Sequence, residues 1–381
     1  MLTEETVLGQ MSWVMRSKTV NMSLTQVGSQ MAPVYFDLPG QPRVQPYHIS
    51  PWQGEDHACL DGRSEGPLRG DFFCLPFGAS DPDDEAPAHG KTASRLWSLG
   101  GHRCGKGVHE LDIRLENALK SAGVRRQFFL IEDHTIVYDR TTISGLTGAY
   151  TLGHHAILSL PSRDSALLLS TSKQMLGMTC PTLFASPAIA EYQSLAVGAS
   201  FEELSSVPSI FKGTSDANCS VFPERRGFTD LLQIAVDVEK GKPAWTAAVN
   251  TEGSYLWFSL RNPSLLPSTI VWIDNRGRHQ PPWSGRNCSL GLEDTCSFFD
   301  KGSKASRQPN AFSKAGVKTI HNFEEGSTMC IPYLQGVAPI PPNFSHVRSA
   351  VCGEAGLTLA DSAGREVFCA ARTQFVFGEE L

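Results

Sequence analysis

The sequence predicts an all-β protein, built as a large antiparallel β-sandwich with few short helices. Three observations support this prediction. Apolar and polar residues alternate along many segments, 34 glycines and 24 prolines supply turns among the 381 residues, and stretches with helical spacing are short. Alternation with a period of two places one face of a strand against a core and the other face against water, as in antiparallel sheets.

The first group of strands is expected between residues 109 and 160. Segment 109–116 shows the clearest alternation, because leucine or isoleucine at every second position is separated by a charged residue. Gly123 is expected to form the turn that follows. Further strands of an antiparallel meander are expected at residues 127–131, 135–138, 141–144 and 155–160.

The second half continues in the same style, with strands expected at residues 231–238, 245–249, 255–260, 269–273, 328–332 and 366–370. Helices are expected only at residues 200–206 and 344–351. Residues 78–89 and 274–287 are predicted to be long loops, and loops of this length in a compact domain are often functional. We interpret residues 1–381 as a single domain, with a domain break near residues 195–225 as the alternative.

Composition narrows the class of function. The net charge of −6 and the pI near 6.0 lack the basic footprint of a nucleic-acid binder. No segment approaches the ~20 apolar residues of a membrane span, and the N-terminus lacks the apolar stretch of an export signal. We therefore expect no nucleic-acid or membrane partner and a cytoplasmic location. The ten cysteines include no C-x-x-C, so neither a zinc knuckle nor a thioredoxin motif is indicated.

Three common catalytic patterns are absent or incomplete. Residues 100–107 match the G-x-x-x-x-G-K spacing of a phosphate loop, but Gly107 stands where a hydroxyl would hold magnesium, and a strand is expected next. His154 and His155 would point to opposite faces of a strand and are not expected to share a metal ion. No G-x-S-x-G elbow occurs. We expect no nucleotide, metal or other cofactor.

An ordered set of short motifs carries a different signal. It consists of Arg69-Gly70, Pro76-Phe77-Gly78, His89-Gly90, Trp97, His155 at the head of an apolar strand, and Glu293 in the run LGLE. This order, between residues 67 and 293, resembles the aldose 1-epimerase (galactose mutarotase-like) family, and most closely its hexose-6-phosphate mutarotase branch. The resemblance implies the galactose mutarotase-like super-sandwich and an isomerase of carbohydrate metabolism that acts on a sugar.

Some positions depart from the family pattern. Asp71 replaces a second glycine, and Asp294 replaces a proline. The threonine and aromatic positions after the histidine are occupied by Ala156, Ile157 and Leu158. The phosphosugar branch has an H-G-F-A-R motif that this chain lacks after His89. Lys91 or Arg95 could supply a positive charge for a phosphate.

The candidate residues suit the interconversion of α and β anomers of an aldohexose. Ring opening needs a base at the O1 proton and an acid at the ring oxygen, and a carboxylate with an imidazole is matched to both tasks near pH 7. We assign Glu293 as the base and His155 as the acid, with His89 as a further catalytic candidate near the ring oxygen. Candidates for substrate binding are Arg69, Asp274, His279, Trp283 and Trp97.

Several alternatives stay open. His154 could replace His155, because a one-residue slip exchanges the two faces of a strand. The same fold could carry a non-catalytic sugar-binding or regulatory protein, or a polysaccharide lyase. A homodimer is also compatible with the sequence.

Overall fold

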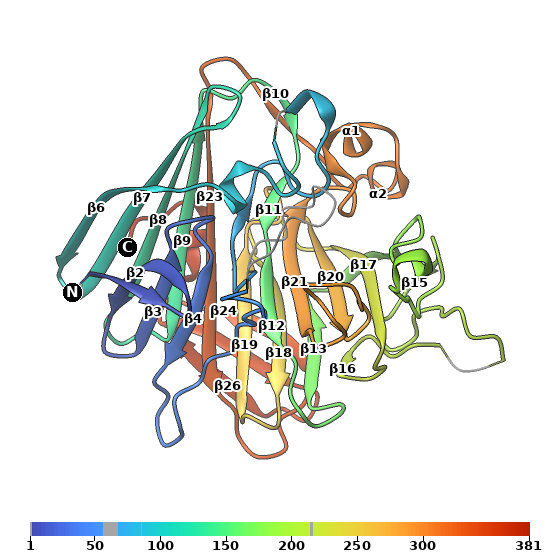
Figure 1. The fold of residues 1–381 in the computed structure, drawn as a ribbon. Helices are drawn as coiled ribbons and strands as arrows, with labels where there is room; N and C mark the ends of the chain where they lie inside the picture. Colours follow the sequence, from blue (N-terminus) through green and yellow to red (C-terminus); the bar gives the residue numbers. More distant parts are fainter. Residues whose placement is uncertain (1, 56–67, 85, 214–215) are drawn as a thin grey trace.

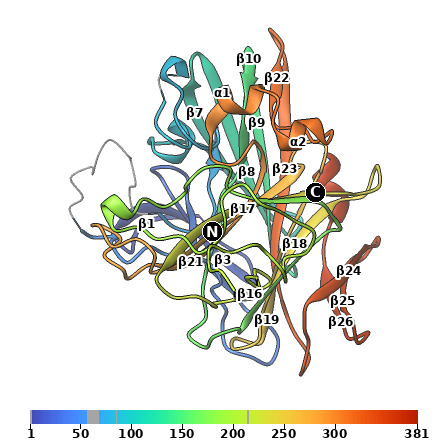
Figure 2. The same ribbon diagram turned by 90° about the vertical axis from the view of Figure 1, so that its right-hand side faces the viewer.

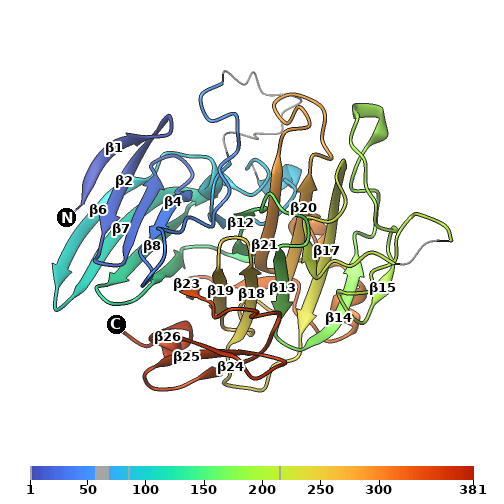
Figure 3. The same ribbon diagram turned by 90° about the horizontal axis from the view of Figure 1, so that it is seen from below.

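The computed structural model describes residues 2–55, 68–84, 86–213 and 216–381, and within them two large antiparallel sheets form the body of the protein (Figures 1 and 3). In spatial order, the nine-stranded sheet consists of β16 (Val221–Phe222), β13 (Leu167–Thr171), β18 (Ala244–Asn250), β19 (Tyr255–Arg261), β23 (Thr328–Pro339), β9 (Ile136–Ser144), β8 (Ala122–Ile131), β7 (Val108–Leu119) and β6 (Ser98–Gly105). The predicted all-β antiparallel sandwich is confirmed.

The eight-stranded sheet carries the segments on which the candidate residues lie. Its strands, in spatial order, are β15 (Ser200–Phe201), β14 (Gln174–Thr179), β17 (Phe228–Val236), β20 (Ser268–Asn275), β21 (Cys288–Cys296), β11 (Leu152–His154) and β5 (Phe73–Cys74), with β12 (Ala156–Ser159) also paired to β21. The inner faces of the two large sheets contribute to one hydrophobic core.

Three smaller sheets complete the architecture (Figures 1 and 2). They are β1 (Thr3–Val7), β2 (Gln10–Arg16), β3 (Val20–Thr25) and β4 (Met31–Phe36); β10 (Gly148–Tyr150) with β22 (His321–Phe323); and β24 (Val347–Cys352), β25 (Gly356–Asp361) and β26 (Glu366–Ala370). The α-helices are α1 (Gly302–Arg307) and α2 (Ala311–Lys314), and short 3-10 turns occur at Pro82–Asp84, Lys91–Ala93, Pro187–Ile189 and Thr373–Phe377.

Burial follows the alternation in the sequence. In β7, Leu111 and Ile113 are fully buried in the same core cluster as Trp13 and Met22 of the four-stranded sheet. Each such side chain contributes roughly 1.5–3 kcal/mol by leaving water. The four-stranded sheet therefore continues the core over the part of the nine-stranded sheet near β7, a role that the sequence analysis did not predict.

Several local predictions were wrong. Gly123 lies inside β8, and the strands predicted at 135–138 and 141–144 form the single strand β9, which begins at Ile136. Residues 200–206 begin with the short strand β15 instead of forming a helix, and residues 344–351 enter the strand β24. In both cases a short apolar spacing that fits a helix is satisfied by pairing with neighbouring strands, to β14 and β25 respectively.

Two other sequence features have simple places in the fold. The phosphate-loop-like residues 100–107 form the end of β6 and the turn into β7, which is a hairpin. β13 and β14 pair with β18 and β17, so strand pairing crosses the alternative break near residues 195–225. Among the described residues, no helix is long and apolar enough to cross a membrane.

Candidate functional site

His155 and Glu293 lie opposite each other on neighbouring strand segments. The register pairs Gly153 with Thr295 on one side of this position and Ala156 with Leu292 on the other, so His155 faces Glu293 across the pair. The distance from His155 Nε2 to Glu293 Oε1 is 3.3 Å. Two residues 138 positions apart in the sequence thus meet as cross-strand neighbours.

The chain makes room for the Glu293 carboxyl group through a missing side chain. A Cβ on Gly291 would lie 2.6 Å from Glu293 Oε1 and 3.0 Å from the Cβ of Trp272. Contacts this short cannot be accommodated beside a packed indole. Gly291, two residues before Glu293 on the same face of β21, therefore allows both the carboxyl group and the Trp272 ring to occupy this wall.

Burial sets the protonation of the pair. Desolvation, together with the charge of Asp300, raises the pKa of Glu293 well above its usual range. Desolvation and the neighbouring His89 lower the pKa of His155 well below its usual range. Burial thus favours the neutral form of each group, a carboxylic acid that can give a proton and an imidazole that can take one.

His89 is the third catalytic candidate at this position, and it carries the second imidazole. Its ring lies 4.9 Å from that of His155, at an interplanar angle of 81°. The backbone N–H of Gly78 donates to His89 Nδ1 at 3.4 Å, which leaves the ring proton of the neutral form on Nε2. Burial lowers the pKa of His89 to about 4, so the ring is neutral near pH 7.

The His89-Gly90 motif has a backbone reason. Gly90 has a φ of +81°, and a Cβ there would lie 2.0 Å from the carbonyl oxygen of Leu75. Only glycine fits this close approach of two backbones. This contact holds His89, the residue before Gly90, against β5. Cys74 Sγ of β5 lies 3.5 Å from His89 Nδ1.

A cavity of about 720 Å³ opens in front of these three residues. Its other lining residues are aromatic and aliphatic side chains with a few charges, namely Leu68, Phe72, Phe184, Leu231, Trp272, Trp283, Arg278, Asp300 and Lys301, together with the segments 78–80 and 86–88. Phe72 stacks on His155 with ring centroids 4.6 Å apart. An apolar cavity with a few converging polar groups is the usual form of a small-molecule site.

The predicted loop after β20 supplies two of the residues that line the cavity. Trp283 lines the cavity, and the guanidinium of Arg278 lies 4.6 Å from its ring centroid. Glu191 lies 3.6 Å from Arg278 Nε. The loop and Trp283 were predicted from the sequence, whereas Arg278 was not selected, although its place five residues before Trp283 was a usable signal.

Asp274 and His279 support this loop instead of lining the cavity. Asp274 Oδ1 accepts the backbone N–H of Gly277 at 3.1 Å, and Oδ2 accepts Asn287 Nδ2 at 2.7 Å. Asn287 Oδ1 in turn lies 2.7 Å from His48 Nε2. Burial raises the pKa of Asp274 to about 6. His279 packs its ring against Tyr192, with ring centroids 5.9 Å apart.

Arg69 and Trp97 were expected to contact substrate, and the structure places both away from the cavity lining. The guanidinium of Arg69 is fully buried and donates to the carbonyl oxygens of Val7 at 3.0 Å and Leu8 at 2.8 Å. Trp97 is buried in the main core and donates its indole N–H to the carbonyl of Thr92. Arg69 therefore joins the first hairpin to the sandwich, because its donors are used by backbone acceptors.

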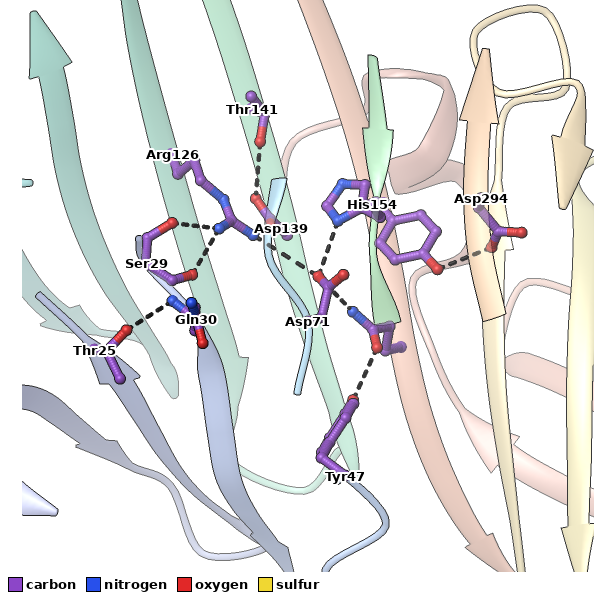
Figure 4. A network of polar contacts seen from close by, with 12 residues as sticks. Thr25, Ser29, Gln30, Tyr47, Asp71, Arg126, Asp139, Thr141, His154 and Asp294 are labelled. Atoms are coloured by element: carbon purple, nitrogen blue, oxygen red, sulfur yellow. Dashed lines mark hydrogen bonds and ion pairs between the residues drawn. The ribbon is translucent and has the colours of Figure 1, made fainter. Parts of the chain in front are cut away.

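His154 is fully buried and does not line the cavity, and Figure 4 shows its ring directed toward Asp71. Its Nδ1 lies 2.9 Å from Asp71 Oδ2, and its ring stacks on Tyr333 with centroids 3.9 Å apart. Tyr333 donates to Asp294 at 2.8 Å. Asp71 and Asp294, two departures from the family pattern, thus belong to one buried polar layer behind the cavity wall.

Arg126 is the cationic centre of this polar layer. It contacts the Asp139 carboxylate directly, lies 3.8 Å from Asp71 Oδ2 and donates to the carbonyl of Ser29 at 2.9 Å. Among the described residues, one group of potential metal ligands was found, formed by Asp71, Asp139 and His154. Since Arg126 already supplies a cation to both carboxylates, we interpret the group as an ion network.

Comparisons with known proteins agree with this architecture. No family model and no curated protein sequence matches the chain. Solved structures do match. A galactose mutarotase-like protein from Clostridium acetobutylicum covers 89% of this chain and 99% of its own, with a TM-score of 0.57 and 9% identity. The chain has the galactose mutarotase-like β-sandwich fold.

Two further structures with this fold broaden the comparison. A putative mutarotase from Salmonella typhimurium covers 89% of this chain and 94% of its own, with a TM-score of 0.56 and 10% identity. A homologue of aldose epimerase from C. elegans covers 87% of this chain and 100% of its own, with a TM-score of 0.51 and 10% identity. At these identities the likeness describes the galactose mutarotase-like fold alone.

Proposed function

We propose that this protein is an aldose 1-epimerase-like isomerase that interconverts the α and β anomers of an aldohexose or a related sugar. The observation that carries the proposal is the pair of Glu293 and His155, 3.3 Å apart in the wall of a 720 Å³ cavity. The aromatic rings of Phe72 and Trp283 offer apolar platforms for a sugar face. Acid and base therefore converge where a pyranose could bind.

The reaction needs one proton removed from the O1 hydroxyl and one delivered to the ring oxygen, after which C1–C2 rotation and reclosure yield the other anomer. In the free protein, burial favours protonated Glu293 and neutral His155. Sugar hydroxyls that donate to the carboxylate favour its ionised form. Binding can therefore move the shared proton to His155, which leaves Glu293 as the base and His155 as the acid.

His89 belongs to the same wall as a neutral donor. With its Nδ1 used by the Gly78 N–H, its Nε2–H is the group available to a sugar oxygen. A neutral imidazole donor can polarise the ring oxygen without taking part in the net proton transfer.

The substrate's phosphorylation state is a separate part of the proposal. Among the described residues, the two cations that line the cavity each have a carboxylate nearby, at 3.6 Å for Arg278 and 2.8 Å for Lys301. Arg95 lines a neighbouring hollow with Ser80 and Asp81. Paired charges give no net attraction for an anion. We therefore propose an unphosphorylated sugar as substrate, and hexose 6-phosphates are the comparison compounds.

The test is anomer exchange measured by polarimetry and by saturation-transfer NMR across free hexoses and hexose 6-phosphates. Glu293→Gln and His155→Asn should each lower the exchange rate roughly 10²–10⁴-fold, the usual contribution of one placed proton-transfer group. The exposed Glu325→Gln is the matched control and should keep the wild-type rate. Retained exchange in both site variants contradicts the assignment, and saturable sugar binding without exchange supports the non-catalytic alternative.

A further inference from the structure

Asp300 and Lys301 place an acceptor and a donor side by side in the cavity wall. Both line the cavity that contains Glu293, His155 and His89. Lys301 Nζ lies 2.8 Å from Asp300 Oδ1. The side chain of Lys301 is 25% exposed and that of Asp300 is 35% exposed. They follow β21, the strand of Glu293, after a short turn. A ligand that reaches Glu293 is therefore within the same enclosure as this ion pair.

The turn that presents the pair is held on one side by β17. Gln233, which is fully buried, accepts the backbone N–H of Phe299 at 2.7 Å and donates to the carbonyl of Ser297 at 2.9 Å. Phe299 adopts a φ of +49°, a conformation that bulky residues rarely take. Such a residue persists only where its surroundings impose the conformation, and it often accompanies a functional position.

The segment opposite fixes the turn from the other side. The N–H of Ala79 donates to the carbonyl of Asp300 at 2.7 Å. Gly78 and Gly302 both have positive φ. A Cβ on Gly78 would lie 2.7 Å from backbone atoms of Asp300, and a Cβ on Gly302 would lie 2.5 Å from the carbonyl oxygen of Ala79. The two backbones are thus in direct contact. The carboxylate of Asp300 is presented from a rigid position, which reduces the cost of ordering it on binding.

We propose that Asp300 and Lys301 form a specificity site that binds two neighbouring hydroxyl groups of the sugar. This inference rests on the proposed function, since it places a sugar in the cavity. The carboxylate accepts a hydrogen bond from one hydroxyl, and the ammonium donates to the oxygen of the next. A vicinal diol satisfies both partners at once, whereas a sugar that lacks one of the two hydroxyls leaves a charged group without its ligand partner.

The experiment compares the parent sugars D-glucose and D-galactose with their monodeoxy analogues. Hydrogen bonds to charged groups account for roughly a 10–100-fold effect on affinity. Asp300→Ala and Lys301→Met should each raise KM for the preferred parent sugar by about that factor. The diagnostic readout is KM, because removing the Asp300 charge also acts on the pKa of Glu293 and so on kcat. One monodeoxy analogue should bind the wild type weakly, and Asp300→Ala should add no further loss for that analogue.

Two controls separate this selectivity from a general structural effect. The exposed Asp133→Ala should leave KM unchanged for every sugar. Asp300→Asn retains the shape of the side chain and should show the same analogue preference in a milder form. An equal rise in KM for the parent and all analogues, or no rise, overturns the specificity site.

Binding measured by saturation-transfer difference NMR separates this inference from the proposed function. Exchange without analogue-dependent losses overturns the specificity site and leaves the isomerase intact. Analogue-dependent binding without exchange supports the site and overturns the isomerase. Absence of both binding and exchange for all the sugars overturns both proposals.

Discussion

Removing the guanidinium of Arg126 should destabilise the protein strongly. Arg126 is fully buried between Asp139 and Asp71, which are themselves 2% and 0% exposed. Arg126→Met leaves both carboxylates without their cation and the carbonyl of Ser29 without this donor. Breaking a buried pair in this way costs about 3–5 kcal/mol. Since native proteins are stable by only ~5–15 kcal/mol, this is a large share of the total free energy of unfolding.

Urea unfolding at pH 7, followed by intrinsic fluorescence, measures this loss. A change of that size should lower the urea midpoint by roughly 1–2 M if the slope stays constant. Arg16→Met is the matched control, because Arg16 pairs with Glu5 at 3.0 Å but both side chains are more than 40% exposed. Exposed pairs contribute about 0–1 kcal/mol. The reasoning is refuted if Arg126→Met costs no more than Arg16→Met.

A second variant checks that the loss comes from the stranded charges. Arg126→Met combined with Asp139→Asn removes both members of the closest pair and should recover part of the stability of the single variant. The non-additive part of this double-mutant cycle measures the coupling between the two groups. Identical midpoints for the single and double variants would show that lost packing, instead of charge, explains the effect.

Two further predictions follow from buried groups near the site. Arg69→Met should lower the free energy of unfolding by about 2–4 kcal/mol, because it leaves the carbonyls of Val7 and Leu8 without their donor. KM per folded molecule should stay unchanged. A raised KM at wild-type stability would restore Arg69 as a substrate-binding residue. Folding lowers the pKa of His89 from 6.5 to about 4. Between these pH values the unfolded chain binds a proton that the folded protein does not bind. The free energy of unfolding therefore falls as the pH drops from about 6.5 to 4. His89→Gln removes up to roughly 3 kcal/mol of this fall, measured as the difference in unfolding free energy between pH 7 and 4.5; parallel pH profiles for the two proteins would contradict it.

The strands with strict alternation were predictable from the sequence, whereas segments buried on both faces were not. In β7 the apolar positions are those that reach the core. The first sheet was missed although β3 alternates strictly, with Val20, Met22 and Leu24 in the core. In β4 nearly every position is apolar and buried, so no alternation marks that strand. The helices predicted at 200–206 and 344–351 do not form, because pairing with a neighbouring strand outweighs a weak local preference for helix.

The candidate site shows the same division. Glu293 was noticeable because a carboxyl group in an apolar run needs a reason. His155 came from the ordered motifs, whereas alternation alone left His154 open as the alternative. Arg69 was misassigned because a sequence motif gives the order of residues but not the direction of a side chain. Asp300 and Lys301 were missed because their position depends on Gln233 and Ala79, which lie far away in the chain.

Consecutive residues of β21 serve two unrelated purposes, since Glu293 faces the cavity and Asp294 faces the ion layer of Arg261 and Tyr333. A one-residue insertion or deletion within this strand would turn each acid toward the environment built for the other. The loops around β21 could lengthen or shorten over evolution, but the register of β21 is fixed by both environments at once. A shift of this register would disrupt the buried ion network and the cavity wall in a single step.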